Sequence, residues 1–355
     1  MNRREFLATG TAALAAMRFH TRDPFVVHEW GVVTIADGAT WARLRSAAGE
    51  GENLPGFVTT WSAAVGQTVE NWKNMPVRKP VVHFYSKEKR TVELRVRIPT
   101  GRPEAWWPPA ADYGPKPDLP PRRGLRVLGE AEAIPDPSDV KPENGLLRWS
   151  LIVDPAGDPK TFPDVPAGHW WATARKIAST PVGADRFVFY DALAPFDPGD
   201  LSKPNVQVED GKATGMTPAD FEKMLRDAGL YEDEAARVTE IWTPEFFQTD
   251  GARAIRIVPR EQIDALLPME ISPAPDELTR VLIAHVECLT PEREREVETR
   301  IAELGADAVE TREAAMKSLE AFGPFAEGAL RRALDSTKDP EVHARLTRLL
   351  SPLTP

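Results

Sequence analysis

The chain has a single cysteine, Cys288, among its 355 residues. One cysteine excludes an intramolecular disulfide, and it excludes the thiolate clusters that hold structural zinc or iron–sulfur centres. The chain also has fewer basic than acidic residues. It contains 44 Lys and Arg and 54 Asp and Glu, which gives a formal net charge of −10. This balance argues against nucleic acid as the main partner. The length suits two domains, or one large domain with an appendage.

The familiar catalytic signatures are missing as well. The sequence contains no G-x-S-x-G elbow, no G-x-x-x-x-G-K-[ST] phosphate loop and no H-E-x-x-H zinc helix. These absences argue against the common hydrolases and NTPases. An active site assembled from distant strands, however, would not show a local sequence motif. The sequence therefore argues against an enzyme but does not exclude one.

The N-terminal segment has the layout of an export signal. Two arginines precede a short apolar run that is too short to span a bilayer, and small residues near Ala15 suit a cleavage site. The residues that carry the signal are Arg3, Arg4, Phe6 and Leu7. The arginine pair resembles a twin-arginine (Tat) signal, a route for proteins that fold before export, often around a cofactor. We expect residues 1–16 to be a signal peptide, and the mature protein to be periplasmic or extracellular, without a transmembrane segment.

Proline and tryptophan divide the chain into unlike parts. Nineteen of the 34 prolines fall between residues 99 and 204, and all ten tryptophans lie between residues 30 and 242. Because a proline inside a helix costs about 3 kcal/mol, the proline-dense middle is not mainly helical. Strands are predicted at residues 25–35, 81–85, 91–98, 147–153 and 186–190. They indicate a β-rich domain over residues 24–216, either a sandwich or a partly open barrel.

Two of these strands flank a polar turn at residues 86–90. In the second strand Val92, Leu94, Val96 and Ile98 alternate with polar residues, which is typical of a strand with one wet face. The natural prediction is a hairpin that pairs residues 81–85 with residues 91–98.

From Thr217 onward the sequence contains patterns that are typical of helices. Thr217 is a good N-cap, Pro218 suits the first helical position, and Gly229 is able to end the helix. A second helix over 232–242, a strand over 254–258, a short helix over 260–267 and a strand over 280–289 follow. Residues 217–289 thus predict an α+β section packed on the β-rich domain.

Residues 290–355 predict a module of short amphipathic helices. Caps or helix-starting prolines occur at Thr290-Pro291, Thr311, Pro324 and Asp339-Pro340. The stretches Arg312-Glu313-Ala314-Ala315 and Asp339-Pro340-Glu341-Val342 resemble a HEAT-type helical repeat, and the resemblance covers residues 292–350. It implies a binding or packing surface rather than chemistry. The whole chain is expected to be α+β, with a HEAT-like α-helical tail.

A second resemblance rests on the segment His28-Glu29-Trp30-Gly31-Val32-Val33-Thr34. It resembles an uncharacterised family of exported bacterial proteins marked by an H-E-W-G-T-F-T segment, with Val32-Val33 in place of Thr-Phe. His169-Trp170-Trp171-Ala172 is similar as well, and the likeness spans residues 25–290. The resemblance implies export and architecture but no activity.

Three histidines are the candidate metal ligands. Neutral imidazoles suit zinc, copper or iron, and His28, His83 and His169 are expected on separate strands that could converge on one ion. In a regular strand, however, His28 and Glu29 point to opposite faces, unless a bulge forms near Gly31. The favoured alternative is that His28 and His169 are buried, hydrogen-bonded structural residues. No motif identifies a cofactor, so a transition metal stays open.

Glu29 is the candidate catalytic carboxylate. A general acid or base needs a second group close by, and no spacing here implies one. The favoured alternative is a buried ion pair with an arginine such as Arg95, Arg97 or Arg175.

Two tryptophan pairs are candidates for a binding surface. Adjacent aromatics on a strand face both ways, so Trp106 with Trp107, and Trp170 with Trp171, would place one ring of each pair at the surface. Such rings would form a platform for sugars or proline-rich peptides. The favoured alternative is that they cover the core beneath long loops.

These observations lead to one main hypothesis and two alternatives. The main hypothesis is a binding or scaffolding protein of the cell envelope, with a protein or an envelope polymer as partner. The alternatives are a metal-dependent enzyme, such as a hydrolase, with a histidine site in the β-rich domain, and a purely structural envelope protein.

Overall fold

The computed structural model describes residues 23–36, 54–61, 80–115, 143–162, 164–194, 196 and 204–351. The predicted signal peptide, residues 1–16, lies outside these residues. Within them strands and helices are both abundant, and the predicted α+β class is confirmed. None of the helices in these ranges has the length and apolar content needed to cross a membrane.

The described strands form two sheets. The larger has nine strands in the order β10-β9-β11-β13-β1-β3-β8-β5-β2, and the smaller has four in the order β12-β4-β7-β6. The strands are β1 (Val26–Ala36), β2 (Thr59–Thr60), β3 (Val81–Tyr85), β4 (Arg90–Ile98), β5 (Arg102–Trp107), β6 (Asp112–Gly114), β7 (Gly145–Val153), β8 (Phe187–Leu193), β9 (Val206–Glu209), β10 (Lys212–Gly215), β11 (Gly251–Ile257), β12 (Met269–Ser272) and β13 (Glu277–Cys288). Only β1 and β13 pair in parallel among these strands, along the whole of β1.

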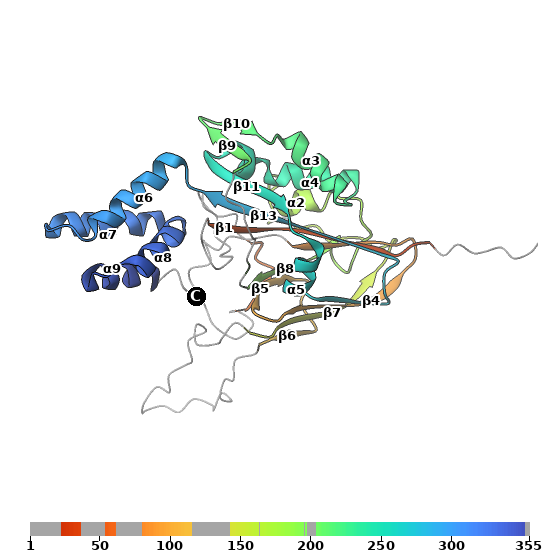
Figure 1. Ribbon diagram of the computed structural model, residues 1–355. Coiled ribbons are helices and arrows are strands. Elements are labelled where there is room, and N and C mark those ends of the chain that lie inside the picture. Colours follow the sequence, from red (N-terminus) through yellow and green to blue (C-terminus); the bar gives the residue numbers. More distant parts are fainter. Residues whose placement is uncertain are drawn as a thin grey trace, which may run out of the picture.

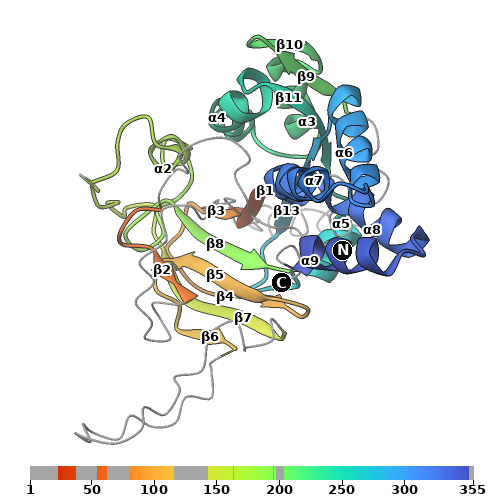
Figure 2. The same cartoon turned by 90° about the vertical axis from the view of Figure 1, so that its left-hand side faces the viewer.

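The body is layered (Figures 1 and 2). The small sheet packs on one face of the large sheet, where Val92 and Val27 belong to one buried core. Helices cover the other face, where Trp30 shares a second core with Val238. These helices are α2 (Trp170–Ala174), α3 (Pro218–Asp227) and α4 (Glu232–Thr243), and the π-helix η3 (Pro244–Gln248) continues α4. The central strands of the large sheet are therefore buried on both faces.

The predicted hairpin between residues 81–85 and 91–98 is wrong. Both strands form, but β3 lies in the large sheet between β1 and β8, whereas β4 lies in the small sheet between β12 and β7. Their burial explains the difference, because β3 is buried on both faces and β4 alternates between buried and exposed positions. The intervening residues thus connect the two layers, and Ser86 Oγ fixes this connection by accepting a hydrogen bond from Arg90 Nε.

The section after residue 217 completes the large sheet. β13 inserts between β1 and β11, so the sheet crosses the boundary predicted at residue 217. Local signals there act as expected: Thr217 caps α3 in a capping box with Asp220, and Gly229, with a φ of 104°, follows the end of the helix. The β9–β10 hairpin turns at Asp210 and Gly211, which both have positive φ. The short helix α5 (Arg260–Leu266) lies beside β13.

The C-terminal tail is helical and has its own apolar core. It follows directly from β13 and consists of α6 (Pro291–Glu303), α7 (Val309–Phe322), the 3₁₀ turn η4 (Gly323–Ala326), α8 (Glu327–Ser336) and α9 (Pro340–Leu350). Helix α6 packs on α7 and α8 packs on α9, and Figure 1 shows the tail projecting from the end of β13. Asp339 caps α9 as predicted, whereas α7 begins at Val309, before the predicted cap Thr311.

Candidate functional site

His28 lies in β1 on the face covered by helices. Its Nδ1 donates a 2.6 Å hydrogen bond to Oε2 of Glu234, in the first turn of α4, and its ring packs against Tyr231 and Tyr85. Burial by itself would raise the pKa of the Glu234 carboxyl, but the hydrogen bond and charge of His28 bring this pKa below its ordinary value. The pair is a buried link between the sheet and α4.

His83 is the direct cross-strand neighbour of His28. Its Nδ1 lies 2.9 Å from Ser179 Oγ, which donates to the carbonyl of Arg186, so the imidazole nitrogen is the donor to the hydroxyl. Burial lowers the pKa of His83 from 6.5 to about 4, against the opposing charge of Glu234. His83 is therefore a neutral, buried imidazole near neutral pH.

The structure brings together only two of the three candidate metal ligands. His169 caps the N-terminus of α2 instead, where its Nδ1 accepts the backbone N–H of Trp171. In the described part of the chain, no three His, Cys, Asp or Glu side chains are arranged to hold a metal ion. In both His28 and His83, however, Nε2 is buried and forms no hydrogen bond with a described residue.

Glu29 points to the opposite face of β1, as strand geometry requires. Its Oε2 accepts a 2.5 Å hydrogen bond from Arg280 Nε, and its Oε1 accepts a hydrogen bond from the Tyr190 hydroxyl. Arg280 also reaches Asp264 on α5 at 2.8 Å. A buried arginine pair is therefore found, as the favoured interpretation held. This network leaves Glu29 no open side from which to act on a substrate.

The arginine partners proposed for Glu29 from the sequence were wrong. Arg95 and Arg97 both pair with Glu270 on the outer face of the small sheet, and Arg175 pairs with Asp185. The partner that the fold selects, Arg280, comes from β13, which lies parallel to β1 in register with it.

Three of the four candidate platform tryptophans are buried. Trp106, Trp170 and Trp171 are 1%, 2% and 0% exposed, and only Trp107 is half-buried, with its ring against Phe57. A platform of exposed tryptophans is therefore absent at these four positions. The rings instead fill the core, as the alternative interpretation expected.

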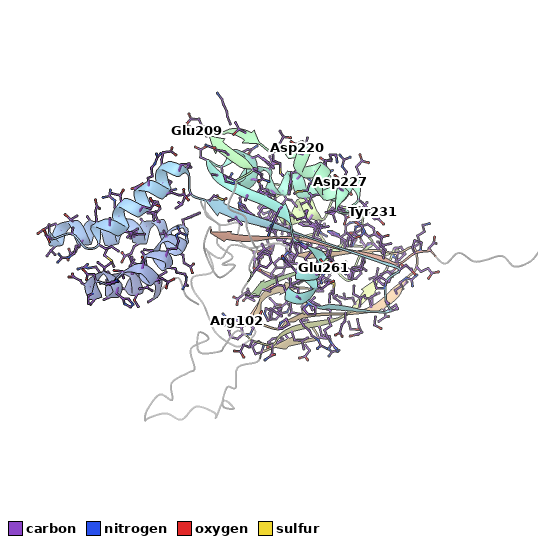
Figure 3. The ribbon with its side chains drawn as sticks, viewed as in Figure 1. Arg102, Glu209, Asp220, Asp227, Tyr231 and Glu261 are labelled. Atoms are coloured by element: carbon purple, nitrogen blue, oxygen red, sulfur yellow. The ribbon has the colours of Figure 1, made fainter. Side chains whose placement is uncertain are left out.

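The candidate site of this protein lies elsewhere, where the body meets the tail. A pocket of about 520 Å³ opens between the β9–β10 hairpin, the π-helix η3, the end of β13 and the start of α6. Its acidic lining residues are Glu209, Asp210, Glu245, Asp250, Glu287 and Glu292. Figure 3 shows Glu209 at the end of the hairpin nearest the tail. We call this cavity the junction pocket.

The floor of the junction pocket is a fixed network of charged groups. Oε1 of Glu287 accepts hydrogen bonds from His285 Nε2 at 2.6 Å and from Arg253 Nε at 3.0 Å. The other imidazole nitrogen of His285 lies 3.5 Å from Oε1 of Glu245. Burial by itself would raise the pKa of Glu287, but its bond with His285 and the charge of Arg253 bring this pKa below the ordinary value. Glu287 is therefore an ionised carboxylate in the pocket floor.

Arg253 joins this floor to the π-helix. Its guanidinium, only 1% exposed, donates to the carbonyls of Phe246 and Thr249 at 2.9 and 2.8 Å, and so caps the end of η3. π-helical turns are rare and occur often at functional sites. Beside them Gly251 has a φ of 143°, and a Cβ there would lie 2.9 Å from the Arg253 guanidinium. Glycine at position 251 therefore leaves room for the Arg253 guanidinium.

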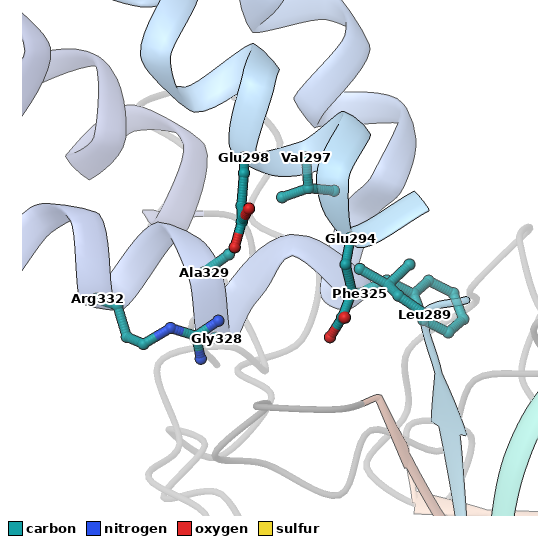
Figure 4. A pocket seen from close by; sticks show the side chains of 8 residues that line it. All are labelled: Leu289, Glu294, Val297, Glu298, Phe325, Gly328, Ala329 and Arg332. Carbon is teal, nitrogen blue, oxygen red and sulfur yellow. The ribbon is translucent and has the colours of Figure 1, made fainter. Parts of the chain in front are cut away.

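A second, smaller pocket of about 40 Å³ lies beside the junction pocket, among the helices of the tail. The two share Leu289 and Phe325 in their walls. Figure 4 shows the carboxylates of Glu294 and Glu298 extending from α6 towards α8. Helix α8 contributes Arg332 to the same pocket. The acidic lining thus continues along α6.

The junction residues were missed at the sequence level, although a signal for two of them exists. His285 and Glu287 are polar residues at alternate positions within an otherwise apolar segment, and in a strand such residues share one face. Nothing in the sequence links them to Glu245 or Arg253. Comparison with known protein families, with characterised proteins and with solved structures finds no match to this chain.

Proposed function

We propose that the protein is an exported binding protein of the cell envelope whose ligand site is the junction pocket. The observation that carries the proposal is the pocket itself: about 520 Å³ with an ordered charged floor, within the range of ligand-binding cavities. The twin-arginine-like N-terminus supports export, and the HEAT-like character of the tail supports a role in binding. By contrast, His28 and Glu29 are sealed in the core.

A fragment screen tests this proposal. We expect polar fragments to bind the mature protein in ligand-observed NMR. This binding should be lost in a variant whose larger side chain fills the pocket. Gln207→Trp suits this purpose because Gln207 is exposed on β9 and lines the pocket. Ile152→Trp is the matched control, since Ile152 is 52% exposed on the small sheet. If no fragment binds, or if hits bind equally to both variants, the proposal is wrong.

The alternative of a metal-dependent enzyme keeps one supporting observation. Metal-binding histidines usually donate their other ring N–H to an oxygen acceptor, and His28 and His83 each have Nδ1 in such a bond while Nε2 is unbonded within the described residues. Metal analysis of untagged mature protein decides between the two functions. We expect no stoichiometric transition metal; one metal per chain, lost in His28→Gln, would favour the enzyme.

A further inference from the structure

We propose that the junction pocket recognises a cationic nitrogen, an ammonium or guanidinium group, carried on an apolar stem. This inference rests on the proposed function and adds the chemical class of the ligand. The source of the group is either a small free amine or a lysine or arginine side chain of a peptide, and the recognition chemistry is the same for both.

The charge of the pocket lining favours a cation. Six carboxylates line the pocket with two arginines, and both arginines are occupied. Arg253 is held by Glu287 and two carbonyls, and the guanidinium of Arg293 lies 5.0 Å above the Phe322 ring in the tail. Among the carboxylates, Glu287 pairs with Arg253 and Glu292 with Arg295, whereas Glu209 and Asp210 form no ion pair within the described ranges. The pocket therefore carries an excess of negative charge that a cation would neutralise.

The floor of the pocket holds a carboxylate in a fixed orientation. Glu287 is 8% exposed, and its Oε1 already accepts from His285 and Arg253. Its Oε2 accepts no hydrogen bond from the described residues, although it belongs to a carboxylate whose orientation is fixed by those two contacts. A carboxylate oxygen held in this way at the pocket surface is a preorganised acceptor for an N–H donor, because little side-chain entropy is lost when the donor binds.

Part of the pocket wall is apolar. Phe325 and Leu289 line the side of the pocket formed by the tail, and Val208 lines the side formed by the sheet. An aromatic face attracts a cation, and apolar side chains favour the methylene stem that carries it. A bare inorganic cation would make no use of this wall. The combination of carboxylates with an aromatic ring thus favours an organic cation.

Isothermal titration calorimetry on the mature protein tests the inference. The probes are cadaverine, as a free amine, and the peptide acetyl-Gly-Lys-Gly-amide, as a side-chain source. The same peptide with an acetylated lysine removes the charge, and glutarate reverses it. We expect saturable binding of at least one cationic probe, weakened by added salt, and no binding of the acetylated peptide or glutarate.

Three variants locate the binding and one controls for charge. Glu245→Gln and Glu209→Gln each remove one carboxylate and should weaken the cationic probe about three- to tenfold, and Phe325→Leu should weaken it about threefold. Glu261→Gln removes the same charge from α5, away from the pocket, and should leave binding unchanged (Figure 3). The preferred probe identifies the source: tighter binding of the peptide indicates a side chain, and tighter binding of cadaverine indicates a free amine.

The results that overturn the inference are distinct from those that overturn the proposed function. No binding of either cation at millimolar concentration, equal binding of glutarate, or equal weakening by Glu261→Gln and Glu245→Gln would overturn the cationic ligand. If fragments nevertheless bind wild type and are lost in Gln207→Trp, the pocket still binds ligands, of another class.

Discussion

The imidazole Nδ1 of His28 lies 2.6 Å from the carboxylate of Glu234, although 206 residues separate the two in the chain. The adjacent Glu29 makes a similar contact on the other face of the same strand, with Arg280, 251 residues away. Two neighbouring residues of β1 thus link the strand to α4 on one face of the sheet and to the Arg280 side chain of the adjacent strand β13 on the other. His28 and Glu29 are therefore placed to stabilise the packing around β1.

Loss of the His28 imidazole should strongly destabilise the protein. In His28→Leu the Glu234 carboxylate stays buried without the hydrogen bond from His28, which we expect to lower the free energy of unfolding by about 3–5 kcal/mol. Urea denaturation measures this change. The double variant His28→Leu/Glu234→Leu should recover part of the loss, and a single-variant loss below about 1 kcal/mol would contradict the buried pair.

Stability should fall in mild acid because of His83. Its pKa is about 4 in the folded protein and about 6.5 when unfolded, so between these values the unfolded chain binds more protons than the folded one. The contribution is complete above pH 6.5 and is lost as the pH falls towards 4, a total of about 3 kcal/mol. Urea denaturation over this pH range should show a shallower slope for His83→Leu than for wild type. Parallel slopes would show that His83 titrates normally.

Gly31 should tolerate no side chain. A Cβ at this position would lie 2.9 Å from Cα of Pro80 and 3.2 Å from Leu282, so Gly31→Ala should cost about 1–3 kcal/mol. Gly168→Ala is the matched control, because a Cβ there meets nothing within 4 Å, and it should change stability by less than about 0.5 kcal/mol. Equal melting temperatures for the two variants would contradict the close approach of Pro80.

Export should depend on the arginine pair. Replacing both Arg3 and Arg4 by lysine keeps the charge but removes the pattern of a twin-arginine signal. We expect the precursor to stay uncleaved in the cytoplasm, whereas Glu5→Gln should be exported normally. Cell fractionation and the mass of the protein measure this, and mature, exported protein from the lysine variant would contradict the prediction.

Much of the fold follows from local signals in the sequence. The alternation from Val92 to Ile98, the capping box at Thr217 and the cap at Asp339 each depend on residues a few positions apart, and each forms the predicted element. The failed hairpin shows the limit of such signals. Alternation identifies a strand with one wet face, but it does not say which sheet the strand joins.

The site depended on contacts that no local pattern encodes. Strand geometry correctly placed His28 and Glu29 on opposite faces, yet Glu234 and Arg280 become their partners only because α4 covers the sheet and β13 inserts beside β1. The junction pocket likewise combines η3, β13 and α6, which are brought together by the end of the sheet. Residues of this kind are recognisable only after the topology is known.

The position of a bound ligand distinguishes the junction pocket from the buried core around His28. Hydrogen–deuterium exchange of the mature protein, measured with and without the tightest-binding fragment of the screen, reports that position. The pocket predicts slower exchange at residues 244–253 and 287–293, with no change at residues 28–30. Protection confined to residues 28–30 and 231–234, or protection that persists in Gln207→Trp, would place the binding site away from the junction and contradict the account.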